Sequence, residues 1–241
     1  MKFTALIAAA SALALAASAH ANSFTNGDFS SNGGNGQVGY NTTITSWYVP
    51  SGGYTFLYAD GTADTGVTVG QYGNNDLWGL NNGGLDAITS PPDGAGQFIA
   101  QDGDFQVQPL DQDITGLTVG KTYTVGFDYA YAQQSGFNGD TIQYWAVSLG
   151  SSPAQDTPAL TNPSHGFTGW FSDSFSFVAN SSSETLSFLA NGNLPVPPFA
   201  LLAGVTFTPD TVPEPAAWAT MILGLAGLGA MARRRRAAVA A

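Results

Sequence analysis

The strongest constraint on the fold of this chain is an alternation of apolar side chains with a period of two residues. In one stretch, alternate positions carry Tyr123, Val125, Phe127, Tyr129 and Tyr131. In an extended strand all five side chains would lie on one face, whereas in a helix successive members would turn by about 200° around the axis. The pattern therefore predicts a β-strand that buries one face.

The same period recurs in shorter segments that are separated by turn residues. These segments are Tyr54-Phe56-Tyr58, Leu110-Gln112-Ile114, Phe171-Phe175-Phe177, Leu186-Phe188 and Phe199-Leu201-Ala203-Val205-Phe207. The run from Ile142 to Leu149 is apolar on both faces, which is typical of a central strand. A turn is expected at Gly116-Leu117-Thr118-Val119-Gly120, just before the longest strand.

Helix signals are missing between residues 22 and 211, so we expect helices only at the two ends of the chain. Short strands with turns between them predict one all-β domain, a two-sheet antiparallel β-sandwich. Its aromatic side chains should meet between the sheets: Phe127, Phe175, Phe177, Phe188 and Phe207. The stretch from Gly61 to Gly96 is too long for a turn, and it is either a functional surface loop or a region of short strands.

The first 21 residues have the pattern of a secretory signal peptide. Lys2 provides the positive start, residues 3–17 form the apolar region, and Ala19 and Ala21 form a small-x-small cleavage site. The mature chain is therefore expected to begin near Asn22.

The charge of the exported part, residues 22–211, is strongly negative. Lys121 is its only basic residue and faces fifteen aspartates and Glu184, which leaves a net charge of −15. Such a surface repels phosphate backbones, so nucleic acid is excluded as a partner, whereas calcium and neutral sugars remain compatible ligands. The chain has no cysteine, which excludes disulfides and a zinc site built from cysteine and histidine.

The sequence offers little for catalysis. His165 is the only histidine left after signal removal, and a solvated loop histidine is the favoured interpretation over a catalytic base. Paired aspartates can hydrolyse glycosides, but most aspartates here stand beside turn glycines, where they serve backbone hydrogen bonds. We therefore expect no enzyme, with a carboxylate-based glycoside hydrolase as the alternative.

Two groups of residues are candidate ligand sites. Trp78 lies in the long stretch between Asp76 and Asn81, where an aromatic ring beside amides and a carboxylate suits sugar hydroxyls. Asp102-Gly103-Asp104 is similar to a fragment of a calcium loop, without the closing Glu. A binding module predicts an exposed aromatic in a shallow site, whereas a purely structural matrix protein predicts no such site.

The tail from Val212 to Arg236 has three parts in a fixed order. It begins with Pro213-Glu214-Pro215, continues with an apolar run at residues 216–232, and ends in Arg233, Arg234, Arg235 and Arg236. As a helix the apolar run would span about 25 Å, near the short limit for crossing a bilayer, and the arginines would stay on the cytoplasmic side with residues 237–241. An ordinary membrane anchor needs only the run and the arginines, and it leaves the two prolines unexplained.

Pro213, Glu214, Pro215, Trp218 and Ala219 stand where the PEP-CTERM sorting signal of Gram-negative bacteria has its defining residues, and the tail resembles that signal. The resemblance implies that an exosortase in the inner membrane recognises the tail and removes it. The protein would then reach the cell surface or the extracellular matrix.

The exported domain also resembles galactose-binding-like jelly rolls, a group that includes carbohydrate-binding modules. The segments that carry this resemblance are Asn26-Gly27-Asp28-Phe29, a tryptophan strand at 44–49, residues 116–123, Phe175-Ser176-Phe177 and Thr185-Leu186-Ser187-Phe188. It implies that the domain binds a polysaccharide. Relatives usually carry an Asp that helps hold calcium where this chain has Ala203-Gly204-Val205. The candidate calcium ligands here are Asp28, Asp102 and Asp104.

Overall fold

A computed structural model of the chain describes residues 21–50, 52–193 and 196–210. The predicted signal peptide up to residue 20 and the predicted transmembrane helix and arginines of the tail lie outside the described residues. A compact unit runs from His20 to Asp210. In the described part of the chain, no helix is both long and apolar enough to cross a bilayer.

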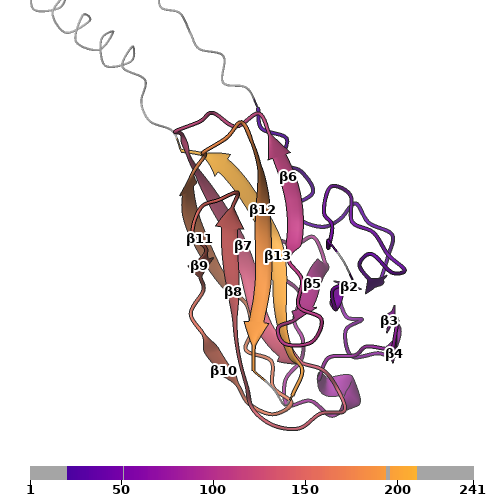
Figure 1. The fold of residues 1–241 in the computed structure, drawn as a ribbon. Helices are drawn as coiled ribbons and strands as arrows, with labels where there is room; N and C mark the ends of the chain where they lie inside the picture. The colour runs from indigo at the N-terminus through magenta and orange to yellow at the C-terminus, as the bar shows by residue number, and fades with distance from the viewer. Residues whose placement is uncertain (1–20, 51, 194–195, 211–241) are drawn as a thin grey trace, which may run out of the picture. The chain divides into compact units, whose positions relative to one another are not determined.

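The domain consists of two antiparallel sheets that face each other (Figure 1). The six-stranded sheet has the order β1 (Gly36–Gln37), β2 (Thr55–Ala59), β5 (Gln97–Asp102), β13 (Pro198–Pro209), β7 (Thr122–Gln133) and β11 (Phe171–Val178). The five-stranded sheet has the order β10 (Leu160–Asn162), β8 (Thr141–Leu149), β12 (Ser183–Gly192) and β6 (Leu110–Thr115), and β9 (Gln155–Asp156) also pairs with β8. The prediction of an all-β antiparallel sandwich is confirmed.

The core between the sheets contains the face predicted from the alternation. All five alternating side chains of β7 belong to this core. The ring of Phe127 meets Phe188 of the opposite sheet edge-on, with centroids 5.3 Å apart, and lies 5.6 Å from Phe175. The predicted meeting of aromatic side chains between the sheets is therefore confirmed.

The alternation predicted for the last strand is wrong for its first half. A register shift between Ala203 and Thr206 marks a β-bulge, and Gly204 at its centre has a positive φ of 58°. The extra residue reverses the faces of the strand. Val205 and Phe207 therefore point between the sheets, whereas Phe199, Leu201 and Ala203 point to the outer face of the six-stranded sheet.

This outer face is covered by a second core. The stretch from Gly61 to Gly96 contributes Ala63 and Leu77, which pack with Phe56, Phe98 and Phe199. The same stretch contains the hairpin of β3 (Val69–Gly70) and β4 (Gly73–Asn74) and the 3-10 helix η1 (Leu80–Asn82). Short strands are thus present, and the stretch serves as a cover that buries both faces of β2, β5 and β13.

The expected tryptophan strand at 44–49 is also wrong. Residues 45 and 46 form a turn with Ser46 at φ 69°, and only isolated bridges occur, including Ile44 to Trp47. Trp47 is buried, and its Nε1–H donates to the carbonyl of Asn26 at 2.9 Å. The turn at residues 45 and 46 places the Trp47 side chain over the core, so no strand is needed to bury it.

Both ends of the domain lie at the same end of the sandwich. The N–H of Ser23 donates to the carbonyl of Thr115, at the end of β6, and the N–H of Asp210 donates to Thr122, at the start of β7. Phe24 packs against Phe207, with ring centroids 5.8 Å apart. The residues that follow the predicted cleavage site are therefore part of the fold.

Candidate functional site

Trp78 lies at the opposite end of the sandwich from Asp210. Its N–H donates to the carbonyl of Gln133, at the end of β7. The side chain is half-buried, its Nε1–H donates to the carbonyl of Phe137 at 2.9 Å, and its ring stacks on His165 at 3.9 Å with an angle of 26°. The imidazole ring of His165 therefore covers one face of the Trp78 ring, which was predicted to contact a sugar.

The polar residues predicted to accompany Trp78 bind their own loop. Asp76 Oδ1 accepts a hydrogen bond from the N–H of Gly66 at 2.9 Å. Asn81 donates from its backbone N–H and its Nδ2 to the carboxylate of Asp64, at 3.0 Å each. Burial raises the pKa of Asp76, the Gly66 N–H lowers it, and the Asp64 carboxylate raises it. These contacts fix the stretch over the outer core.

His165 lies in a turn between strands, as the sequence predicted, and it also makes specific contacts. It is half-buried and has a left-handed backbone at φ 65°, and its N–H donates to Gln133 Oε1 at 2.9 Å. Its Nε2 lies 2.6 Å from Asn138 Oδ1. With its ring against Trp78 as well, His165 has a packing role in which its ring nitrogen is already engaged.

The three candidate calcium ligands do not form one site. Asp28 is exposed, and its Oδ1 accepts from both the N–H and the hydroxyl of Ser30. Asp102 is only 1% exposed, and its Oδ1 accepts from the N–H groups of Asp104 and Phe105 at 2.9 and 3.0 Å. Across residues 21–50, 52–193 and 196–210, no group of three His, Cys, Asp or Glu residues is arranged to hold a metal ion.

The environment of Asp102 is unusual for a carboxylate. Burial raises its pKa to about 6, although the two N–H groups that it accepts lower it, and the nearby Asp104 raises it further. Asp104 itself is half-buried. Asp102 therefore serves to pin the turn that leads into Phe105.

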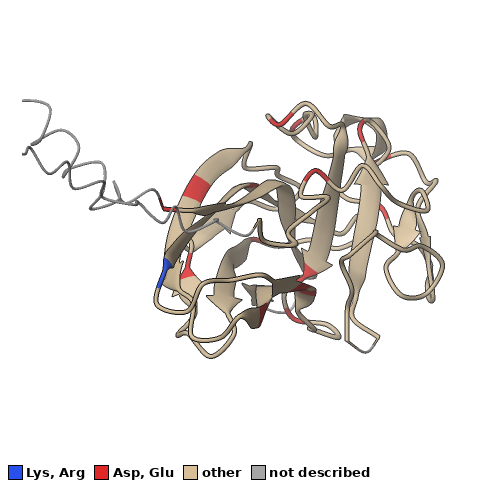
Figure 2. Ribbon diagram, turned by 90° about the horizontal axis from the view of Figure 1, so that it is seen from above, with Lys and Arg blue, Asp and Glu red and all other residues tan. Residues whose placement is uncertain are grey.

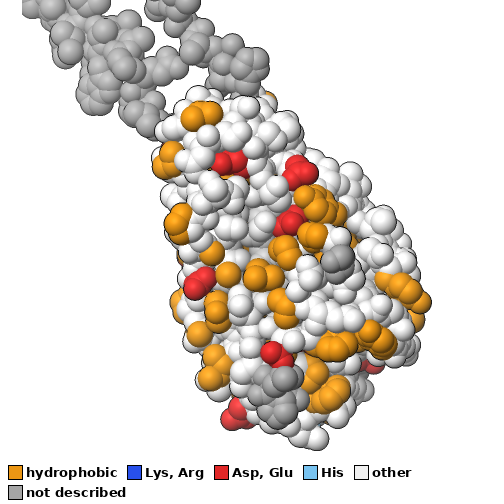
Figure 3. All heavy atoms as spheres, in the orientation of Figure 1, with side chains coloured by type: hydrophobic (Ala, Val, Ile, Leu, Met, Phe, Trp, Pro, Cys, Tyr) orange, Lys and Arg blue, Asp and Glu red, His pale blue; other side chains and the backbone are white. Residues whose placement is uncertain are grey.

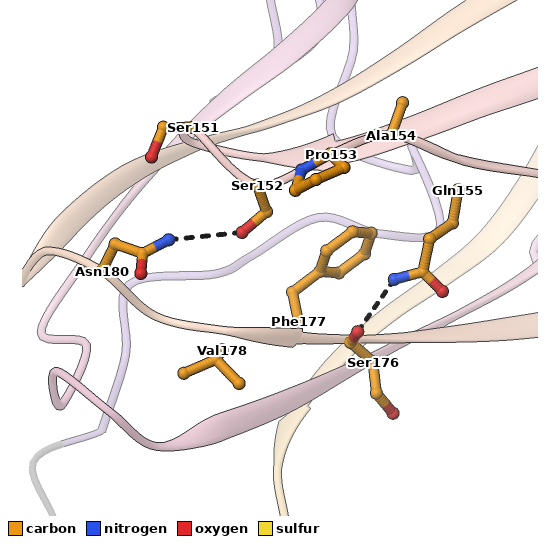
Figure 4. A pocket seen from close by; sticks show the side chains of 9 residues that line it. All are labelled: Ser151, Ser152, Pro153, Ala154, Gln155, Ser176, Phe177, Val178 and Asn180. Atoms are coloured by element: carbon orange, nitrogen blue, oxygen red, sulfur yellow. Dashed lines mark hydrogen bonds between the residues drawn. The ribbon is translucent and has the colours of Figure 1, made fainter.

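A shallow hollow with a volume of about 420 Å³ lies between the β8–β9 turn and the end of β11 (Figure 4). It is lined by Ser151, Ser152, Pro153, Ala154, Gln155, Ser176, Phe177, Val178 and Asn180. Gln155 Nε2 bridges its two walls by donating to the carbonyl of Ser176 at 2.9 Å. Serine and asparagine are common in turns, so no sequence signal distinguished these residues.

The sequence also missed a group of surface aromatics at the same end as Trp78. Tyr72, at the tip of the β3–β4 hairpin, is 63% exposed, and Phe105, just after β5, is 44% exposed. Their ring centroids lie 5.8 Å apart, and both lie against Tyr54, at 6.0 and 5.3 Å. We call Tyr54, Tyr72 and Phe105 the aromatic rim. The sequence contains one signal for this group, because an aromatic residue stands next to a glutamine in both Gln71-Tyr72 and Phe105-Gln106.

Carboxylates are spread over the domain, and Lys121 is the one basic side chain among the described residues (Figure 2). On the face shown in Figure 3, apolar side chains reach the surface in separate spots between polar groups. The described surface therefore has the character of an acidic exported protein with local apolar contacts, as the composition predicted.

Residues 211–236 match the PEP-CTERM protein-sorting motif. The recognition of this signal from Pro213, Glu214, Pro215, Trp218 and Ala219 is thereby confirmed. The chain is thus an exported protein that is sorted at the membrane, and the motif implies processing by an exosortase. No curated protein sequence matches the chain.

Several solved structures are similar to this chain. A CBM4 protein is 16% identical and covers 64% of this chain and 94% of its own, with a TM-score of 0.31. TmCBM61 in complex with β-1,4-galactotriose is 13% identical, with coverages of 79% and 99% and a TM-score of 0.38. A cyclase from Fischerella sp. TAU is 13% identical, with coverages of 78% and 96% and a TM-score of 0.47.

Proposed function

We propose that this protein is a non-catalytic component of the cell surface or extracellular matrix of a Gram-negative bacterium, and that its sandwich domain binds exopolysaccharide. An exosortase removes the tail after recognising Pro213, Glu214 and Pro215. The observation that carries the proposal is that the sorting motif begins directly after Asp210, where the last strand of the domain ends. The domain therefore lies directly before the signal that sorts it.

The topology supports a binding role at the end of the domain far from the tail. From Phe199, which pairs with Asp102, β13 leads to Asp210 over about 36 Å, at about 3.3 Å per residue. Trp78 and the aromatic rim lie near the Phe199 end. A chain attached through its C-terminal end would thus keep these aromatics away from the point of attachment.

The chemistry of the described residues supports binding over catalysis. The ring of His165 packs on Trp78. The carboxylates of Asp28 and Asp102 accept hydrogen bonds within turns, and those of Asp64 and Asp76 accept hydrogen bonds from other parts of the long stretch. Glycoside hydrolysis needs two facing carboxylates with separate pKa values, one acid and one base or nucleophile. The hydrolase alternative would require such a pair, and a purely structural matrix role would require no ligand.

Processing is tested by the intact mass of the protein released by its native host. The expected chain starts near Asn22 and ends near Pro213–Pro215, and a host strain without its exosortase should keep the tail. Recovery of Arg233–Arg236 in material from the unmodified host would show an ordinary membrane anchor instead.

Binding is tested with polysaccharide isolated from the same host. The released protein should be retarded in gels that contain this polymer and should release no reducing sugar from it. Unretarded migration would favour the purely structural matrix role, and release of sugar would favour the hydrolase.

A further inference from the structure

The aromatic rim leaves more ring surface exposed to solvent than packing on the outer core requires. Tyr54 is buried and belongs to that core, where it contacts Phe56 and Phe199. Tyr72 and Phe105 extend this cluster to the surface and remain 63% and 44% exposed. Burying these two rings against a partner would remove apolar area from water, which is favourable.

Two glutamine side chains continue the rim as a line of hydrogen-bonding groups. Gln71 Nε2 donates to Gln106 Oε1 at 2.6 Å, and Gln106 Nε2 donates to the hydroxyl of Tyr72 at 2.8 Å. The tyrosine O–H and the Oε1 of Gln71 are left at the two ends of this line. An uncharged donor and an uncharged acceptor therefore lie beside the exposed rings.

The rim and its amides are held in place from the interior. The buried Gln37 accepts the N–H of Gln71 at 2.8 Å, and the buried Asp102 accepts the N–H of Phe105. Gln106 has a left-handed backbone at φ 48°, which is uncommon for a residue other than glycine, and its carbonyl accepts the N–H of Tyr54. Strained residues of this kind persist where the surroundings fix them, often at ligand contacts. The geometry is thus set before any ligand arrives.

We infer that Tyr72, Phe105 and the amides of Gln71 and Gln106 form a binding site for an uncharged sugar ring of a polysaccharide. The inference rests on the proposed polysaccharide binding and assigns it a site. The apolar C–H face of a sugar ring packs on the aromatic rings, while its hydroxyls, which both donate and accept, meet the amides and the tyrosine hydroxyl.

The charge around the site selects among sugars. Asp104 lies one residue before Phe105, Asp102 accepts the N–H of Phe105, and the domain carries a net charge of −15. Its one basic side chain, Lys121, stands directly before β7, at the opposite end of the sandwich from the rim. An acidic sugar would bring its carboxylate towards these groups without a cation to pair with. The site therefore takes neutral residues and rejects uronic acids.

The test uses the exported protein purified from its native host. It is titrated with host polysaccharide, with a neutral galactan and with polygalacturonate, and affinity is measured by calorimetry. Tyr72→Ala and Phe105→Ala remove the rings. Gln106→Gly removes one amide and keeps the backbone conformation, because glycine adopts positive φ readily. Tyr40→Ala removes an equally exposed ring (61%) outside the rim.

We expect binding of a neutral polymer and not of polygalacturonate. Each rim variant should lose about tenfold or more in affinity and still unfold cooperatively, and Tyr40→Ala should bind as the unmodified protein does. If the protein binds polysaccharide and the rim variants retain full affinity, the site is rejected and the proposed function stands. Preference for polygalacturonate would also overturn the site, and no binding to any polymer would reject both proposals.

Discussion

At the scale of single residues, burial of the Asp102 carboxyl makes the stability of the domain depend on pH. Its folded pKa of about 6 is above the ordinary value, because burial disfavours the charged form. The unfolded chain releases this proton at lower pH than the folded chain does. The stability contributed by the protonated group is therefore complete below about pH 4 and is lost as the pH rises through 6.

Replacing Asp102 by Asn should remove this pH dependence. Asn keeps the acceptor for the N–H groups of Asp104 and Phe105 and cannot ionise. At pH 7.5 the variant is expected to be more stable than the unmodified protein, by up to about 3 kcal/mol for a shift of about two pKa units. Urea unfolding at pH 5 and pH 7.5 measures this difference, with the exposed Asp86→Asn as control. Equal pH dependence in both chains would contradict the assigned role of Asp102.

At the scale of strands, the inner face of β7 provides the clearest energetic prediction. Phe127 is buried between Phe175 and Phe188, so Phe127→Ala leaves a cavity in the core between the sheets. The expected loss in free energy of unfolding is about 3–5 kcal/mol.

The matched control is Phe171→Ala, an exposed phenylalanine on β11 that stacks on Tyr129 at 5.5 Å. Its loss should be limited to about 0.5–1.5 kcal/mol, the contribution of an exposed aromatic pair. Denaturant unfolding compares the two variants. Similar losses would show that the face assigned to Phe127 is wrong.

The sequence predicted those strands whose side chains alternate without interruption. β7 was found because its large apolar side chains all lie on one face and alternate without interruption. β13 was assigned to one face only, because the bulge at Gly204 reverses the alternation and a glycine between apolar residues gives no warning of it. The second core was missed because the residues that cover it, such as Leu77, are few and scattered among glycine and asparagine.

In the candidate sites, too, residues that are contiguous in sequence were predicted, and residues from distant segments were not. Pro213, Glu214 and Pro215 were recognised because the sorting motif is contiguous in sequence. The aromatic rim joins Tyr72, on the β3–β4 hairpin, to Phe105, which follows β5, and these two segments meet only in the folded domain. The two aromatic–glutamine pairs are visible in the sequence, but nothing local in either pair shows that they lie side by side in the fold.

At the scale of the whole molecule, the four arginines of the tail should decide retention at the membrane. Each contributes on the order of 1 kcal/mol of attraction to anionic lipid. Neutral replacements at Arg233, Arg234, Arg235 and Arg236 are expected to weaken retention and to leave the unfolding of the domain unchanged. Cell fractionation measures the first effect and thermal unfolding the second. Unchanged fractionation would contradict the role given to the arginines.

The position of β13 also bears on the order of events during export. This strand is the last of the domain and lies between β5 and β7, so both neighbours have an open edge until it arrives. Pairings between segments so distant along the chain form slowly, because the intervening loop must close first. We therefore expect the polypeptide to cross the membrane as an unfolded chain that needs protection from aggregation. Because β13 directly precedes the sorting motif, the six-stranded sheet can close only after nearly the whole domain has been exported.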